Sequence, residues 1–204
     1  MPTEPTAIST PVPTGRPRVA RWQRSRLAAH RAAPPDTAPL LDDRRLAGVR
    51  SRLDELCARG RLEQVPPDPH AVADGVHLAA MNYRRAVRHI EDPDVAVVFL
   101  YQSVVNTADT VLLCLGHHAR DFEGHKLAIA ITAELVAALQ GSSRARLMSA
   151  TSDRLRRRRH EALYSRTGVM TEMDVRVTLE ECREFLPRLW TLSGRLAGCV
   201  RGVA

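Results

Sequence analysis

The chain has 204 residues, of which 44% are hydrophobic, and this is enough for one folded domain with a core of its own. Aromatic residues make up only 4%, which disfavours an all-β sandwich, because strands favour aromatic and β-branched side chains. The formal net charge of +7 is carried almost entirely by arginine, since Lys126 is the single lysine, and it favours polyanionic partners without specifying one.

The cysteines and the apolar segments limit the compartment in which the protein is expected. Cys57, Cys114, Cys182 and Cys199 lie far apart and form no CxxC pair, which is typical of reduced, buried thiols. No apolar run approaches the roughly 20 residues of a membrane-spanning helix, and the N-terminus lacks the apolar core of a secretory signal. We therefore expect a cytoplasmic bacterial protein without membrane contact.

Residues 1–37 are expected to form a disordered basic tail, because they are rich in proline, threonine and arginine and show no sustained apolar period. The tail carries six arginines against two carboxylates, Glu4 and Asp36. Such a segment is either a solvated tail or an arm that binds nucleic acid.

Residues 38–62 are predicted to hold an accessory helix, and Gly60 is placed to end it as a C-cap. Its apolar residues recur every three or four positions: Leu46, Val49, Leu53 and Leu56. The rigid sequence VPPDP, residues 65–69, then separates it from the main domain, residues 66–200. We expect the accessory helix to pack on the side or end of that domain.

The main domain is predicted to be an all-α, up-and-down bundle of four or five helices, because helical periods alternate with short connections. No strand alternation, internal repeat or glycine-rich phosphate loop is visible. Pro187 is expected to kink the last helix. In the first helix the residues predicted to face inward are Val72, Val76, Leu78, Ala79 and Tyr83. The predicted helices span about residues 69–90, 95–115, 125–139, 143–164 and 172–196.

The fourth predicted helix contains the basic run DRLRRRRHEALY, residues 153–164. Its apolar stripe continues past Leu155 onto Arg159, so Arg159 should border the buried face. Because a guanidinium keeps its charge, this position calls for an acidic partner, an anionic ligand or a polar cleft, unless the stem of the side chain reaches water. Arg154 and Arg157 should face water. A neighbouring row spaced by four residues comprises Arg156, His160 and Tyr164.

The second predicted helix is largely apolar but carries one polar ridge. The ridge is formed by Gln102, Asn106 and Asp109, with Ser103 and Thr110 alongside. If it faces the fourth helix, Asn106 and Asp109 are placed to orient Arg159 and His160. If it faces outward, it is only the solvated side of a bundle helix.

The string RHEALY, residues 159–164, resembles the R-[N/H/D]-x-x-x-[H/Y] motif of the HEPN superfamily, in an R-H-x-x-x-Y form. In that superfamily the motif ends the fourth helix of a short bundle whose second helix carries polar residues. The segment GHKLAI, residues 124–129, also resembles its loop-to-helix histidine, and the resemblance covers roughly residues 68–198. It implies a homodimer whose two motifs meet in one basic cleft. Many members are metal-independent endoribonucleases, commonly toxins or defence components, whereas others bind nucleotides or partner proteins.

The resemblance implies catalytic roles for three residues of the motif. Arg159 would bind phosphate and His160 would be the polar residue beside it, while Tyr164 stands where active members carry a histidine. A tyrosine titrates near pH 10 and a histidine near pH 6.5, so Tyr164 suits a binding role and His160 is the group that exchanges a proton near neutral pH. Whether the protein cleaves RNA stays open at this point.

The expected ligand is RNA or a nucleotide, bound by a homodimer without a metal or other cofactor. His117, His118 and His125 lack the carboxylate or cysteine spacing that would complete a metal site. Two alternatives remain: an adaptor bundle that binds a partner protein in an apolar groove, and a DNA-associated protein that uses its tail. The residues expected to bind substrate are Ser103, Asn106, Asp109, Arg156 and Arg158.

Overall fold

A computed structural model of the chain describes residues 44–66, 68–120, 123–164, 168 and 170–201. All of them belong to one unit of the chain, residues 33–204. In this described part there are six α-helices, one short 3-10 helix and two three-residue strands, so the predicted all-α bundle with an N-terminal accessory helix is confirmed. The predicted tail, residues 1–37, lies outside the described residues.

An Asp-Pro pair begins each of the first two bundle helices, α4 (Pro69–Arg88) and α5 (Pro93–Cys114). The side chain of Asp68 accepts a hydrogen bond of 2.9 Å from the amide of His70, and Asp92 caps α5 in the same way. Aspartate is a good N-cap, and proline is tolerated in the first turn because its missing N–H has no partner there.

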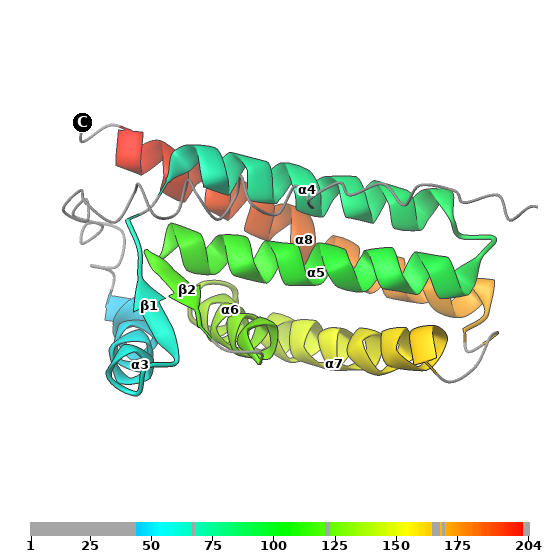
Figure 1. The fold of residues 1–204 in the computed structure, drawn as a ribbon, viewed down its shortest axis with the longest axis horizontal. Helices are drawn as coiled ribbons and strands as arrows, with labels where there is room; N and C mark the ends of the chain where they lie inside the picture. Colours follow the sequence, from blue (N-terminus) through cyan, green and yellow to red (C-terminus); the bar gives the residue numbers. More distant parts are fainter. Residues whose placement is uncertain (1–43, 67, 121–122, 165–167, 169, 202–204) are drawn as a thin grey trace, which may run out of the picture. The chain divides into compact units, whose positions relative to one another are not determined.

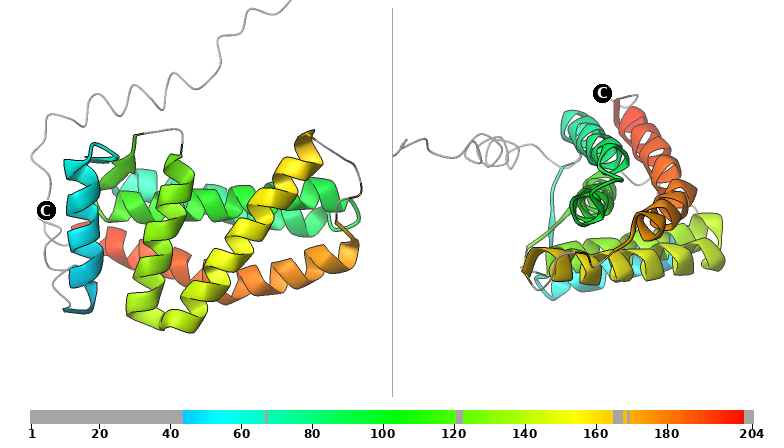
Figure 2. Two further views of the ribbon diagram at one scale, coloured as in Figure 1. Left: turned by 90° about the horizontal axis from the view of Figure 1, so that it is seen from below. Right: turned by 90° about the vertical axis from the view of Figure 1, so that its right-hand side faces the viewer.

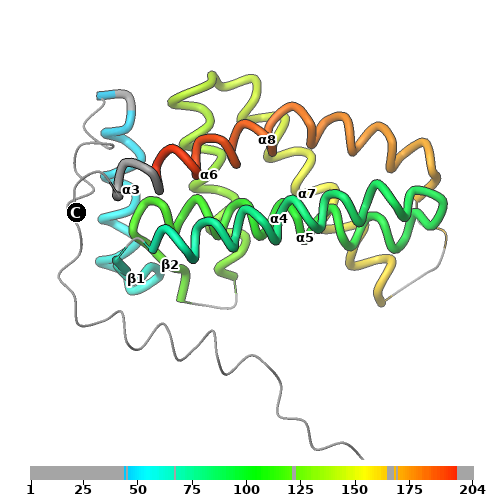
Figure 3. Tube along the Cα trace, turned by 90° about the horizontal axis from the view of Figure 1, so that it is seen from above, coloured from blue at the N-terminus to red at the C-terminus, as the bar shows by residue number. Residues whose placement is uncertain are grey.

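Close packing of α4 on α5 depends on Gly75. A Cβ at this position would collide with Oγ1 of Thr110 on α5. Further along the same contact, the Ser103 hydroxyl donates a hydrogen bond of 2.8 Å to the carbonyl of Ala79. As a result α4 lies directly along α5 (Figure 1 and Figure 3).

The bundle is completed by α6 (Gly124–Gln140), α7 (Ser142–Tyr164) and α8 (Glu172–Arg201). α5 is its central element, because it contacts each of the other bundle helices. α6 and α7 cover the side of α5 opposite α4, and α8 packs against α4, α5 and α7 (Figure 2). Gly141, with a φ of 97°, turns the chain between α6 and α7, a conformation that favours glycine. α8 continues through Pro187, the position of the predicted kink.

The core is built mainly on α5 and α8. Its largest fully buried side chains on these helices include Leu100, Leu112, Phe185, Leu186 and Leu189. By length and composition alone α5 would be able to cross a membrane, contrary to the expectation that no run is apolar enough. Yet 61% of its apolar window is buried inside the bundle, as in the core helix of a globular protein.

Three cysteines fall in the part of the chain whose side chains are described, and all three are free thiols. Cys114 and Cys182 are buried, as predicted, and Cys57 is half-buried. Burial raises the pKa of Cys114 to about 11 and that of Cys182 to about 12, so neither is an activated nucleophile at neutral pH.

The structure also contains two short strands that the sequence pattern does not predict. Strands β1 (Leu62–Gln64) and β2 (His117–Ala119) pair antiparallel. At three residues each they are too short to show a period-two alternation. The amide of Val65 extends the pairing by donating to the carbonyl of Gly116 at 2.8 Å, so the proline-rich break is hydrogen-bonded to the start of the α5–α6 connection.

The accessory helix consists of a 3-10 turn, η1 (Arg44–Leu46), and α3 (Ala47–Ala58). It contacts α6, as expected for a helix on the side of the bundle. The four residues predicted to form its apolar stripe are all buried in the common core: Leu46, Val49, Leu53 and Leu56.

On α4 the predicted inward face is correct except at one position. Val72 and Ala79 are buried, and Val76 and Tyr83 are half-buried. Leu78 is 43% exposed. The contacts of α4 are with α5 on one side and α8 on the other, so a side chain turned away from both remains in solvent.

Candidate functional site

One side of α5 is left half-exposed by its neighbours, and it carries the predicted polar ridge. Ser103 points to α4, where it binds the Ala79 carbonyl, while Tyr101 lies under Arg159 of α7. Gln102 lies between these two contacts, because consecutive helical residues are rotated by about 100°. The ridge of Gln102, Asn106 and Asp109 is therefore half-exposed along the boundary between α4 and α7.

Arg159 turns inward from α7 onto the ring of Tyr101. Its guanidinium carbon lies 5.4 Å from the centre of the Tyr101 ring, a cation–π arrangement. The Nε atom is buried and lacks a hydrogen-bond partner. Among the residues that the structure describes, no carboxylate lies within ion-pairing distance of this side chain. A positive charge at the edge of the core is thus left without a counter-charge.

Asp109 pairs with His125 of α6 beside this arginine. Nδ1 of His125 lies 3.0 Å from Oδ2 of Asp109, and the two side chains are 59% and 37% exposed. The hydrogen bond to Asp109 raises the pKa of His125, and burial and the charge of Arg159 oppose that rise. The pair joins α5 to the first turn of α6.

The position of His125 is fixed by the start of α6. Gly124 precedes it and packs against β2, where an added Cβ would come within 2.8 Å of the Ala119 Cβ. Glu123, at the N-cap, makes no side-chain capping bond, so the first amide groups of α6 keep their affinity for an anion.

These side chains from α5, α6 and α7 act on one another electrostatically. Burial raises the pKa of Tyr101, while the guanidinium groups of Arg159 and Arg156 lower it. Arg159 also lowers the pKa of His125. We name Tyr101, Asp109, His125 and Arg159 the Arg159 cluster.

The other two residues of the predicted catalytic motif lie apart from this cluster. His160 and Tyr164 are exposed on the outer side of α7, Tyr164 by 72%, and their ring centres are 5.1 Å apart. The step from Arg159 to His160 rotates the side chain by about 100°, which takes it from the edge of the core to solvent. The motif is continuous in sequence but divided between two sides of the helix.

The residues expected to bind substrate are also divided. Ser103 is buried against α4, and Asn106 Oδ1 accepts a hydrogen bond of 3.0 Å from Gln102. Arg158 donates to Glu161 at 3.1 Å on the same helix. Only two of the five approach the Arg159 cluster, namely Asp109, which belongs to it, and Arg156, which affects the pKa of Tyr101.

The prediction that Arg154 faces water is wrong. Its guanidinium pairs with Glu181 of α8, and the same carboxylate accepts a hydrogen bond of 2.9 Å from the hydroxyl of Thr151. Helix α8 lies beside this part of α7 and was not foreseen there, because periodicity within one helix does not reveal its neighbours.

The sequence does not indicate Tyr101 as part of the site, and it indicates His125 only as the histidine of the GHKLAI segment and as one of three histidines that form no metal site. Tyr101 carries no polar pattern that separates it from a core aromatic. The signal for His125 was present, as a histidine directly after a glycine that begins an apolar helix. Within the described ranges, no group of three or more His, Cys, Asp or Glu side chains is placed to hold a metal ion.

His117 plays a different part from His125. It is buried, and its Nδ1–H donates a hydrogen bond of 2.7 Å to the Leu115 carbonyl. Burial lowers its pKa and keeps the ring neutral. It therefore belongs to the packing of β2.

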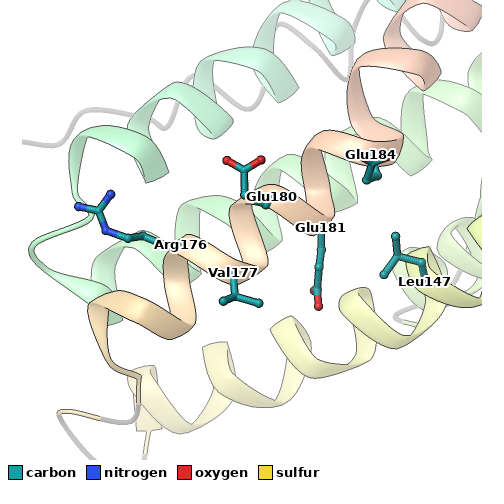
Figure 4. A pocket seen from close by; sticks show the side chains of 6 residues that line it. All are labelled: Leu147, Arg176, Val177, Glu180, Glu181 and Glu184. Atoms are coloured by element: carbon teal, nitrogen blue, oxygen red, sulfur yellow. The ribbon is translucent and has the colours of Figure 1, made fainter.

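A second surface feature is a shallow groove between α7 and α8. Figure 4 shows Val177 and Glu181 of α8 directed toward α7, which supplies Leu147, while Arg176 and Glu180 point away from α7. Val177 is 52% exposed. The groove has an apolar floor, and glutamates lie along the α8 side.

Comparison with known proteins adds no relative to this picture. No protein-family model, curated protein or solved structure matches the chain. The resemblance to the HEPN superfamily therefore stays a prediction that rests on the RHEALY motif and on the helical bundle around it.

Proposed function

We propose that the protein binds RNA through the polar face around the Arg159 cluster. The observation that carries this proposal is the guanidinium of Arg159, whose buried Nε has no hydrogen-bond partner and which pairs with no carboxylate in the described part of the chain. Burying part of a charge without a counter-charge is unfavourable, and a phosphate group would supply the missing anion with charge-assisted hydrogen bonds. Arginine suits this task because its planar fork matches the oxygens of a phosphate.

The groups near Arg159 and the net charge of the chain support a polynucleotide as the ligand. The guanidinium lies over the ring of Tyr101, and its charge acts on the exposed His125 in the first turn of α6. Arg156 adds a second positive charge on the same helix. The chain as a whole carries +7, which favours association with a polyanion at low salt.

The test compares two arginines of α7 that carry the same charge. Arg157 is exposed and makes no described interaction, so Arg157→Ala controls for the loss of one positive charge. Fluorescence anisotropy with a short 2′-O-methyl oligoribonucleotide, which lacks a free 2′-hydroxyl, measures affinity alone. We expect Arg159→Ala to weaken binding by about 10- to 100-fold, the value of a hydrogen bond to a charged group, and to lower the salt slope by about 1.

Equal and small losses in the two variants would contradict the proposal, because they indicate diffuse attraction to a basic surface. An unlabelled mononucleotide that competes fully with the oligoribonucleotide would make a nucleotide, rather than RNA, the ligand of this face.

An adaptor that binds a partner protein is the second candidate, and the α7–α8 groove favours it. Its apolar floor and acidic side fit a basic amphipathic helix. Arg159→Ala would leave such binding intact, whereas Val177→Asp would abolish it. The predicted homodimer and cytoplasmic location stay predictions under either candidate.

A further inference from the structure

We infer that His125, held by Asp109, is the proton-transfer residue of a metal-independent ribonuclease centre in which Arg159 binds the phosphate. The inference rests on the proposed RNA binding at the same face. It moves the acid–base role from His160, which the sequence motif favours, to a histidine on a different helix.

The hydrogen bond to Asp109 fixes the orientation of the His125 ring. Nδ1 donates its proton to Oδ2 of Asp109 at 3.0 Å, which leaves Nε2 of the neutral ring as the free, basic nitrogen. The side chain is 59% exposed, so this nitrogen is within reach of a bound substrate. A carboxylate that holds a histidine in one tautomer is the arrangement that hydrolases use to present a general base.

Two charged groups act on His125 from the helices packed against α6. Asp109 of α5 raises its pKa, and Arg159 of α7 lowers it, with a net rise. Histidine is the side chain best suited to take up a proton and release it in one cycle, and the hydrogen bond to Asp109 makes the ring of His125 a stronger base than an isolated imidazole.

His160 has no comparable support. It is exposed, its ring is tilted by 44° against that of Tyr164, and in the described part of the chain no carboxylate pairs with it. The neighbouring Arg159, and not His160, lies over the ring of Tyr101. The orientation of the His160 ring is therefore left to solvent, whereas His125 is held by a second helix.

The proposed step needs only RNA and water. Nε2 of His125 takes the proton of a ribose 2′-hydroxyl, and the 2′-oxygen forms a bond to the adjacent phosphorus. The bond from phosphorus to the 5′-oxygen breaks, and that oxygen takes a proton from water. Arg159 stabilises the charge on the phosphoryl oxygens. The products are a 2′,3′-cyclic phosphate and a 5′-hydroxyl end, and His125 then returns its proton to solvent.

The test separates cleavage from binding. End-labelled RNA of mixed sequence is incubated with the full chain in EDTA across a pH series, and cut ends are resolved on a denaturing gel. The 2′-O-methyl version of the same sequence reports affinity. His125→Asn should lower the cleavage rate by at least about 100-fold while leaving affinity within a few-fold. His77→Asn, an exposed histidine on α4, is the matched control and should cleave as the wild type does.

Asp109→Asn supplies the pH signature of a positioning residue. Loss of the carboxylate lowers the pKa of His125, so the acid limb of the rate profile should move to lower pH. Far-UV circular dichroism confirms that each variant is folded.

Wild-type protein that binds the oligoribonucleotide through Arg159 but does not cut RNA would overturn this inference and leave the binding proposal standing. Cleavage that survives His125→Asn and is lost in His160→Asn would overturn it in favour of the sequence motif. If RNA binding does not depend on Arg159, the proposed function itself is contradicted.

Discussion

Two arginines five residues apart on α7 stand in opposite situations. Arg154 faces α8, where it pairs with Glu181, and this carboxylate also accepts the hydrogen bond of the buried Thr151. Arg159 faces α5, where it meets an aromatic ring and no carboxylate in the described part of the chain. The two share a helix, a residue type and a partly buried stem.

The difference between them lies in the partner that the fold supplies. The Arg154 pair is complete within the protein and connects α7 to α8, so its contribution is to stability. Arg159 lacks a carboxylate partner among the described residues, so we propose that its contribution is to ligand binding. The arginine-rich segment of α7 therefore contains side chains with different partners, which the neighbouring helices determine.

The largest expected effect comes from truncating Leu155, a core residue of α7 that lies between Arg154 and Arg159 in the sequence. Leu155 lies on the buried stripe of α7 and is 0% exposed. We expect Leu155→Ala to lower the free energy of unfolding by about 2–5 kcal/mol, through lost burial and the cavity left behind. Urea denaturation measures it. Leu163→Ala, at a position 45% exposed, serves as the control and should change stability by about 0.5 kcal/mol or less.

A smaller effect separates the two arginines themselves. Arg154→Ala should lower the free energy of unfolding by about 1–2 kcal/mol, because it removes a partly buried ion pair. Arg159→Ala should leave stability unchanged or raise it slightly, because it removes an unpaired charge. Thermal denaturation of the two variants checks the contrast, and an equal loss in both would argue that Arg159 is also a structural residue.

The smallest expected effect concerns the pKa of His125. Asp109→Asn should lower it and Arg159→Ala should raise it, as followed by NMR titration of the ring protons. Because the folded pKa is raised, the pair stabilises the fold below about pH 6.5, the unfolded value, and this stabilisation is lost as the pH rises through the folded pKa. An unchanged pKa of His125 in both variants would show that neither Asp109 nor Arg159 acts electrostatically on it.

The helices themselves followed from the sequence because their signals are local. Apolar spacing, the prolines after Asp68 and Asp92, and Gly141 place each element within a few residues of its position in the structure. The accessory helix was predicted equally well, since its apolar stripe is continuous. Strands β1 and β2 were not, because three residues paired over a long separation leave no local period.

The candidate site was predicted only in part, because it is assembled from three helices. The stripe of α7 indicated that Arg159 borders the core, which the structure agrees with. It did not indicate that Tyr101 lies beneath it or that His125 pairs with Asp109. Those contacts depend on how α5, α6 and α7 cross, and one helical period holds no information on the crossing.

The most direct test of the account is the RNA affinity of Arg154→Ala and Arg159→Ala, measured side by side by anisotropy with the 2′-O-methyl oligoribonucleotide at one salt concentration. The account predicts that Arg154→Ala binds within about twofold of the wild type, as expected for a charge already paired inside the protein, and that Arg159→Ala binds at least about tenfold more weakly. Equal affinities for the two variants would contradict it, because the unpartnered arginine would then be no more available to an anion than the paired one.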